Sequence, residues 1–322
     1  MNIAMGKVLT EYRVGDRLRD AIDDNNLLLL VISRFSIPFG FGDSTIGEVC
    51  EENGIDCATF LSVANLVCSK KAQTYDVSPR ALIDYLKKAH TYFLDFNLPL
   101  IRRKLIDAVN NSSIDDVAFL IIKYFDDYVI EVRRHMEYEN DTLFGYISRL
   151  ASGEAVTDYS IEEYSATHTD MGDKLNELKD IIIRHYRQKG NDTLNSVLYD
   201  IINCQADLVT HCMVENRLLV PAVRRLEQSI ADKSSIVPQK VEKSEDAAKS
   251  PDSLSEREKE VIVCVAKGKS NKEIADELCL SINTVTTHRR NIASKLQIHS
   301  QSGLAIFAII HHLIDIKEIK LQ

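Results

Sequence analysis

One short pattern occurs twice in this chain, at residues 135–140 and again 76 positions later at residues 211–216. In each copy a histidine is followed four positions later by a glutamate and then by an asparagine. Each copy lies within a long amphipathic stretch that favours a helix, and residues four apart on a helix share a face. Two such helices facing each other bring two imidazoles and two carboxylates into one small volume. The pattern therefore favours a bundle of long helices with a metal site inside it.

Helix-start and helix-stop signals divide the middle of the chain into four long segments. Ser78 followed by Pro79 predicts the start of the first, and Pro99 should kink this helix without ending it. A capping box of Ser160 and Glu163 should open the third helix, and Gly190 should close it. The four predicted helices cover about 78–109, 114–150, 160–190 and 192–228. Helices of about 30 residues joined by short polar loops predict an antiparallel four-helix bundle over 78–229.

The bundle is flanked by two smaller segments, and strand signals are almost absent throughout the chain. Residues 1–72 read as a small helical domain, with helical segments at 24–35, 45–52 and 57–68. Residues 230–252 are rich in Lys, Glu, Ser, Asp and Pro and predict a flexible linker. A last domain should occupy 253–322. We therefore expect an all-α protein with three folded parts.

The remaining two bundle helices each offer a histidine to the metal site. The first carries His90, whereas the third carries both His168 and His185, which lie about 25 Å apart along a helix axis. His168 lies nearer the level of the paired ligands, while His185 suits the helix C-terminus as a favourable cation. A single pair could be a surface ion pair, but two pairs with two further histidines favour a metal. The predicted ligands are His90, His135, Glu139, His168, His211 and Glu215, a set that suits two iron ions.

This arrangement resembles hemerythrin-like bundles over about 80–228, in particular the di-iron proteins that repair iron–sulfur clusters. The resemblance rests on His90 followed by Leu98-Pro99, on His135-x-x-x-Glu139-Asn140, on His168, and on His211-x-x-x-Glu215-Asn216 with Pro221. It implies a di-iron centre with oxo and carboxylate bridges, two histidines on each iron and both glutamates bridging. Oxygen carriers of this type have a further histidine where this chain has Gly172. That difference implies an open coordination position for NO, O2 or peroxide.

The N-terminal segment also resembles the small domain that precedes the bundle in the repair proteins. Where those proteins carry adjacent cysteines and glycines, residues 40–43 here read Gly-Phe-Gly-Asp. We expect Cys50 and Cys57 to be packing residues, because a free cysteine is usually buried and unreactive. The missing thiol pair argues against repair activity.

The C-terminal segment has the signals of a helix-turn-helix. Capping boxes at Ser255 and Ser270 open two helices, and Gly268 ends the first. Ser281 caps a third, over 282–296, which is rich in polar and basic side chains. Two short helices with a tight turn, the second polar and basic, indicate major-groove binding.

The same segment resembles the LuxR-type DNA-binding domain over about 253–320, through Asn271-Lys-Glu-Ile-Ala and Thr284-Val285-x-x-His288-Arg289-x-Asn291-Ile292. The resemblance implies that the third helix enters the major groove and that the fourth, at 301–313, forms a homodimer contact. Carried over, base edges would be approached by Thr286, Thr287 and Arg290. The implied phosphate contacts are Lys272, Thr284, Arg289 and Lys295.

Charge and cysteine content favour a cytoplasmic protein that meets DNA through its last domain alone. From residue 254 onward ten Lys and Arg face eight Asp and Glu, whereas the rest of the chain carries 29 against 40. No apolar run approaches the roughly 20 residues of a membrane span. Seven cysteines are scattered without any C-x-x-C, which favours reduced thiols.

Two functions remain open from the sequence. The favoured one is a transcription regulator, not an enzyme, that binds double-stranded DNA and senses NO, O2 or redox stress through a di-iron centre. The alternative is an iron–sulfur repair or di-iron redox protein with an accessory DNA-binding domain. The absent cysteine pair favours the first.

Overall fold

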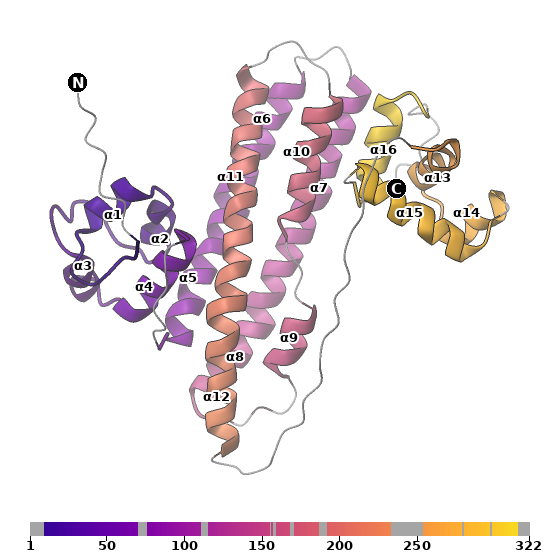
Figure 1. Cartoon of the computed structure of the whole chain (residues 1–322). Coiled ribbons are helices and arrows are strands. Elements are labelled where there is room, and N and C mark those ends of the chain that lie inside the picture. Colours follow the sequence, from indigo (N-terminus) through magenta and orange to yellow (C-terminus); the bar gives the residue numbers. More distant parts are fainter. Residues whose placement is uncertain are drawn as a thin grey trace. The chain divides into compact units, whose positions relative to one another are not determined.

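The fold is all-α, as the sequence predicts. The computed structural model describes residues 10–69, 76–110, 115–154, 156, 159–167, 171–186, 192–232, 254–278, 280–296 and 298–314 (Figure 1). Among these residues the only strand-like pairing is an isolated bridge between Arg17 and Thr45. They fall into two compact units, drawn from residues 1–96, 133–170 and 207–238 and from residues 97–132, 171–206 and 239–322.

A small N-terminal helical domain belongs to the first unit. Its helices are α1 (Leu18–Asp24), α2 (Leu28–Arg34), α3 (Ile46–Glu52) and α4 (Cys57–Val67). Thr45 opens α3 with a capping box, and the Asp56 carboxylate accepts from the Thr59 amide to open α4. The sequence prediction missed α1, because this helix has seven residues and starts without a side-chain cap.

The long helices of the bundle follow the predicted segments, with one exception. The first is α5 (Pro79–Thr91), η1 (Tyr92–Asn97) and α6 (Leu98–Asn110); the second is α7 (Asp115–Tyr138), η2 (Glu139–Leu143) and α8 (Phe144–Ala151); the fourth is α11 (Asp192–Val214), η3 (Glu215–Leu219) and α12 (Val220–Asp232). The three η elements are π-helical turns. The helix is not broken at Pro99. Instead the wide turn η1 precedes it, which relieves the carbonyl that proline cannot bond.

The prediction of one uninterrupted third helix is wrong. The third segment contains α9 (Ile161–Thr167) and α10 (Asp173–His185), with a turn at residues 171–172. The turn includes Gly172, and glycine is a weak helix former. Ser160 caps α9 as expected, since its hydroxyl accepts from the Glu163 amide at 3.3 Å. Gly190 and His168 lie outside the described residues.

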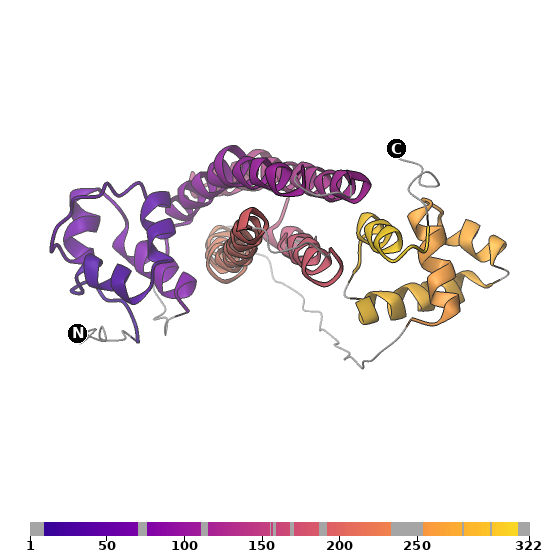
Figure 2. The ribbon, with the colours of Figure 1, turned by 90° about the horizontal axis from the view of Figure 1, so that it is seen from above.

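The C-terminal domain belongs to the second unit, and its described residues form four helices. They are α13 (Glu256–Ala266), α14 (Asn271–Glu277), α15 (Ile282–Leu296) and α16 (Gln301–Ile310). The capping boxes of Ser255 and Ser270 are both present, and Gly268 adopts φ +84° after α13, a conformation that favours glycine. Within this unit α16 packs against α13 and against α10 (Figure 2).

Two further sequence expectations concern the linker after the bundle and membrane-spanning helices. α12 runs to Asp232 and so includes the first residues of the predicted linker 230–252, the rest of which lies outside the described residues. No helix in the described ranges has both the length and the apolar character of a membrane crossing.

Candidate metal centre

Four of the six predicted ligands converge inside the first unit. They come from three different helical stretches: His90 on α5, Glu139 at the start of η2, and His211 with Glu215 around the junction of α11 and η3. Each offers a ligand atom, and all four atoms lie within 4.8 Å of one another. All four residues are at most 2% exposed.

The distances show nitrogen and oxygen donors that face each other. The Nε2 atoms of His90 and His211 are 3.2 Å apart, and His90 Nε2 lies 3.3 Å from Glu139 Oε2. His211 Nε2 is 3.1 Å from Glu215 Oε1, and His135 Nε2 is 3.1 Å from Glu139 Oε1. Both predicted histidine–glutamate pairs therefore point into one volume, with His135 at its partly exposed edge. Two buried carboxylates facing imidazole nitrogens are a donor set that fits first-row metal ions.

The π-helical turns lie at or close to the cluster ligands. η2 begins at Glu139 and η3 begins at Glu215, and η1 begins two residues after His90. A π-helical turn changes the direction of the following side chains, and such turns are frequent at functional sites. The sequence shows no clear signal for η2, which has no proline after it.

Tyr164 is a member of the site that the sequence analysis missed. Its hydroxyl, on α9, donates to Glu139 Oε1 at 2.6 Å, and its side chain is buried. Tyr164 stands four positions before His168, so a helix would place both on one face. That spacing was the available signal.

The repeated asparagine differs between the two copies of the motif. Asn140 Oδ1 lies 3.1 Å from His90 Nδ1, so the ring can donate there and keep the lone pair of Nε2 turned to the cluster. Asn216 is exposed instead. The Phe144 ring stacks on His90 at a centroid distance of 5.6 Å and fixes the imidazole plane.

Protonation states in the cluster suit metal binding. Burial raises the pKa of Glu139, but the imidazoles of His135 and His90 beside it outweigh this effect and hold the pKa well below its usual value. Burial also lowers the pKa of His90. His211 differs, because Glu215 raises its pKa against the effect of burial. An ionised carboxylate and a neutral imidazole are the forms that bind a metal, whereas a proton on His211 would compete with it.

A buried ion pair lies one helical turn before His211. Arg34 of α2 and Asp207 of α11 form a bidentate pair with distances of 2.9 and 2.6 Å, and both are buried. The Arg34 guanidinium also lies 5.2 Å from the centre of the Phe93 ring, which makes a T-shaped contact with the His211 ring at a centroid distance of 5.8 Å. The N-terminal domain is thus tied to the helix that carries two ligands.

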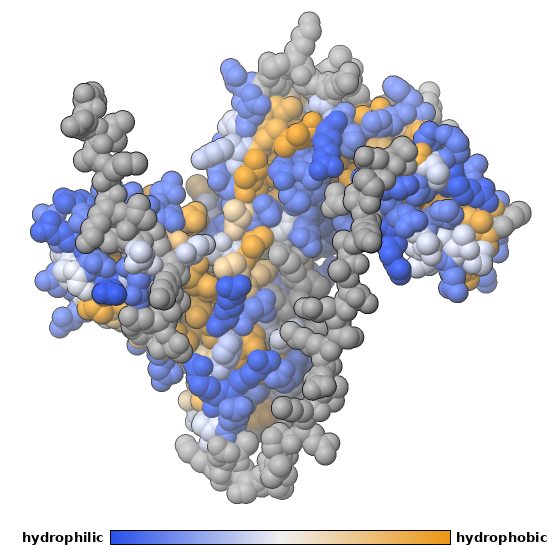
Figure 3. Space-filling view, in the orientation of Figure 1, coloured by the Kyte–Doolittle hydropathy of each residue, from blue (hydrophilic) through white to orange (hydrophobic). Residues whose placement is uncertain are grey.

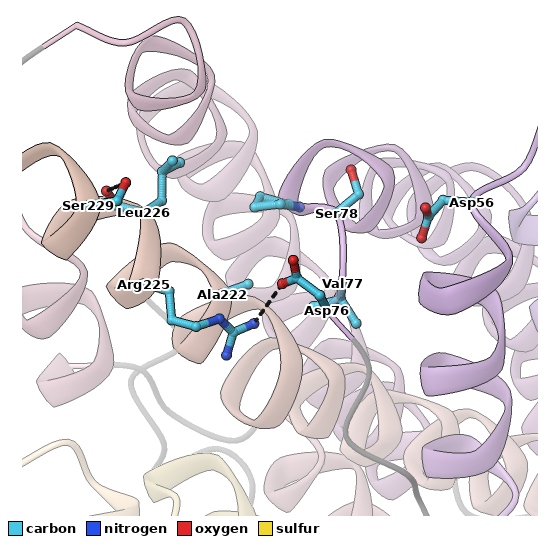
Figure 4. A pocket seen from close by; sticks show the side chains of 9 residues that line it. Asp56, Asp76, Val77, Ser78, Ala222, Arg225, Leu226 and Ser229 are labelled. Carbon is cyan, nitrogen blue, oxygen red and sulfur yellow. Dashed lines mark hydrogen bonds and ion pairs between the residues drawn. The ribbon is translucent and has the colours of Figure 1, made fainter.

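A separate cavity of about 500 Å³ lies between α12 and the starts of α4 and α5, and none of the cluster ligands lines it. Arg225 reaches across it to Asp76 at 3.7 Å (Figure 4). Its two helix caps are already engaged, because Asp56 accepts from an amide of α4 and Ser78 from an amide of α5. The cavity shows no grouping of reactive side chains.

The predicted DNA-binding residues lie on the C-terminal domain, whose visible surface is mostly hydrophilic (Figure 3). Thr286, Thr287 and Arg290 are exposed on α15, and Lys272 is exposed on α14. The other three predicted phosphate contacts already have protein partners: Thr284 with Ser281, Arg289 with Asn271, and Lys295 with Glu258 at 2.7 Å. Lys295 would have to leave Glu258 to reach a phosphate.

Two parts of the chain match known protein families. Residues 81–223 match the hemerythrin HHE cation-binding domain, and residues 252–308 match the bacterial regulatory proteins of the luxR family. The chain is 38% identical over 91 residues to the transcriptional regulatory protein LiaR of Bacillus subtilis, which is 28% of this chain and 42% of that protein. It is 45% identical over 62 residues to the response regulator protein VraR of Staphylococcus aureus, 19% of this chain and 30% of that protein. No solved structure matches the chain.

Proposed function

Because this chain joins a hemerythrin HHE domain to a LuxR-family DNA-binding domain, we propose that it is a transcription regulator whose DNA binding responds to a di-iron centre. The observation that carries the proposal is the buried cluster of two imidazoles and two carboxylates in the same chain as an exposed helix-turn-helix. The relatives named above are regulators, and each is matched over less than half of its length.

The residues that would hold the irons are His90, His135, Glu139, His168, His211 and Glu215. When bound, two irons would supply redox chemistry and an exchangeable position for NO, O2 or peroxide. The protein itself excludes water from the cluster by burial. Asn140 and Tyr164 orient His90 and Glu139, so that a change in the iron would alter contacts that reach η2 and α9.

On DNA, Thr286, Thr287 and Arg290 would read base edges, while Lys272, Thr284, Arg289 and Lys295 would contact phosphates. The proposed active form is a cytoplasmic homodimer. The repair alternative lacks a thiol pair at residues 40–43, and burial raises the pKa of both Cys50 and Cys57, which keeps these thiols unreactive.

The test is a footprint on duplexes selected from a random library by the full-length protein, prepared without oxygen and loaded with iron. The footprint should change on addition of NO or O2. A Glu139→Ala, Glu215→Ala double variant should bind the same duplexes without any response to the gases. An unchanged wild-type footprint under NO, O2 and peroxide would contradict the sensing proposal, and restored activity of a damaged iron–sulfur enzyme would favour repair.

A further inference from the structure

Arg34 is a buried cation that joins three helices of the first unit. It is the last residue of α2, which packs against α5 (Figure 1). Its guanidinium donates to both oxygens of Asp207 on α11 at 2.9 and 2.6 Å, and it lies 3.4 Å from the Tyr85 hydroxyl on α5. A buried charge must be paired, and the planar fork of arginine fits a carboxylate with two parallel hydrogen bonds. One side chain of the N-terminal domain therefore connects the helices that carry His90 and His211.

Aromatic rings on both sides of His90 in the chain also contact this guanidinium. Tyr85 precedes His90 on α5, and Tyr92 and Phe93 follow it in η1. The central carbon of the guanidinium lies 5.7, 5.6 and 5.2 Å from the centres of the three rings, in that order. Cation–π contacts are stronger where water is excluded. Arg34 therefore holds the chain before and after a predicted metal ligand.

The ring of His211 is held in a different way from the ring of His90. Its Nε2 atom faces Glu215 and His90, but no acceptor among the described residues meets its buried Nδ1 atom. In His90 the corresponding Nδ1 atom lies 3.1 Å from Asn140 Oδ1. A histidine that binds a metal usually donates its other ring N–H to an oxygen, which fixes the orientation of the ring. Within the described part of the chain, packing must supply that orientation for His211.

Phe93 supplies this packing, and Arg34 holds Phe93. The rings of Phe93 and His211 make a T-shaped contact at a centroid distance of 5.8 Å, with an angle of 87° between their planes. Asp207 stands four residues before His211 on α11, so both lie on one face of the helix. A carboxylate at that position is suited to orient a histidine, but both of its oxygens accept from Arg34. Arg34 thus engages Asp207 and fixes Phe93 at the same time.

We propose that Arg34 is a positioning residue of the metal centre, which holds the His211 ring in its metal-binding orientation through Phe93 and Asp207. The N-terminal domain is then part of the centre, although none of the proposed ligands belongs to it. The inference rests on the proposed function in one respect, namely that the cluster binds a metal. It depends neither on which metal binds nor on DNA.

The test compares the full-length wild type with an Arg34→Met, Asp207→Leu double variant. Apolar side chains that replace both partners of a buried ion pair often leave the stability unchanged, so the double variant removes the pair without leaving an unpaired charge. Leu28→Ala is the control for stability. Leu28 is buried on the same helix α2, and its truncation destabilises the core but removes neither a charge nor an aromatic ring.

Two measurements report the site. Long-range ¹H–¹⁵N NMR spectra of the metal-free proteins report the ring nitrogens of His211 and need no metal. Titration with Co²⁺ in competition with a chelator gives the metal Kd. In the double variant the ring nitrogens of His211 should shift, and the Kd should rise about 10- to 100-fold, as it does when other outer partners of metal ligands are lost. Leu28→Ala should keep the wild-type signals of His211 and the wild-type Kd.

If circular dichroism shows that the double variant fails to fold, Phe93→Leu tests the same contact, because it removes the ring between Arg34 and His211 and keeps an apolar side chain. The same shift and the same rise in Kd are expected of it. Wild-type signals of His211 or a wild-type Kd in the folded variant would overturn the proposal, and so would equal effects in Leu28→Ala. A wild type that binds no Co²⁺ would contradict the metal site itself, and the NMR comparison would still test Arg34.

Discussion

Replacing Tyr164 with phenylalanine should weaken metal binding without unfolding the bundle. The change removes one hydroxyl, which donates to Glu139 Oε1 at 2.6 Å from a side chain that is 3% exposed. A hydrogen bond to a charged group contributes about 1.5–3 kcal/mol, and loss of an outer partner typically costs about 10–100-fold in metal affinity. We therefore expect the metal Kd to rise about 10- to 100-fold.

The assay is a titration of full-length, metal-free protein with Co²⁺ in competition with a chelator, because the visible absorption of Co²⁺ reports its coordination. Tyr128→Phe is the matched control. Its hydroxyl donates at 3.1 Å to the carbonyl of Met171, and neither residue belongs to the cluster. The control makes the same chemical change at another buried tyrosine.

Two results would count against this role of Tyr164. In the first, Tyr164→Phe binds Co²⁺ with the wild-type Kd to within twofold, so the hydroxyl does not position Glu139. In the second, Tyr128→Phe loses as much affinity as Tyr164→Phe, so the effect is one of general stability. Either result would refute the positioning role.

Three more predictions concern other parts of the molecule. Arg34→Met leaves the buried Asp207 without its cation and should lower the free energy of unfolding by about 3–5 kcal/mol in urea, whereas a loss under about 1 kcal/mol would mean that the pair is hydrated. Arg290→Ala should relax sequence preference by about 1–3 kcal/mol at one base pair, while Lys272→Ala should weaken specific and random DNA alike; equal losses in both assays would contradict this division. Burial, then the neighbouring imidazole and Arg184, lower the pKa of His185 to about 4, below the ordinary 6.5. The neutral form of His185 is therefore favoured while its ring contacts Phe307 and His311. Hydrogen exchange at the amides of α16 should then rise as the pH falls from 6.5 towards 4, and His185→Gln should show no such rise from this group.

The helices were predictable because their ends carry local signals. Ser255, Ser270 and Ser281 are followed at fixed spacing by the groups they cap, and the helices begin where these spacings predict. The turn at residues 171–172 before α10 was less visible, since a weak helix former such as Gly172 does not say whether tertiary contacts will keep a helix continuous.

Part of the candidate site could be predicted from the sequence for a similar reason. The two histidine–glutamate pairs follow from helical periodicity, and the structure places both around one volume. For Tyr164 the sequence offers only its four-residue spacing to His168, and which carboxylate its hydroxyl meets depends on which helices face each other. The Arg34–Asp207 pair depends on the same tertiary arrangement, which no local pattern encodes. The proposed role of His168 stays a prediction, because it lies outside the described residues.

The most direct test of the central claim is the iron content of full-length protein purified without oxygen, together with that of the Glu139→Ala, Glu215→Ala double variant. The proposal predicts about two irons per wild-type chain, as in carboxylate-bridged bundles. It predicts loss of most iron from the double variant, because these carboxylates balance the charge of the cations. Full iron occupancy in the double variant, or a wild-type protein that takes up no iron, would contradict it.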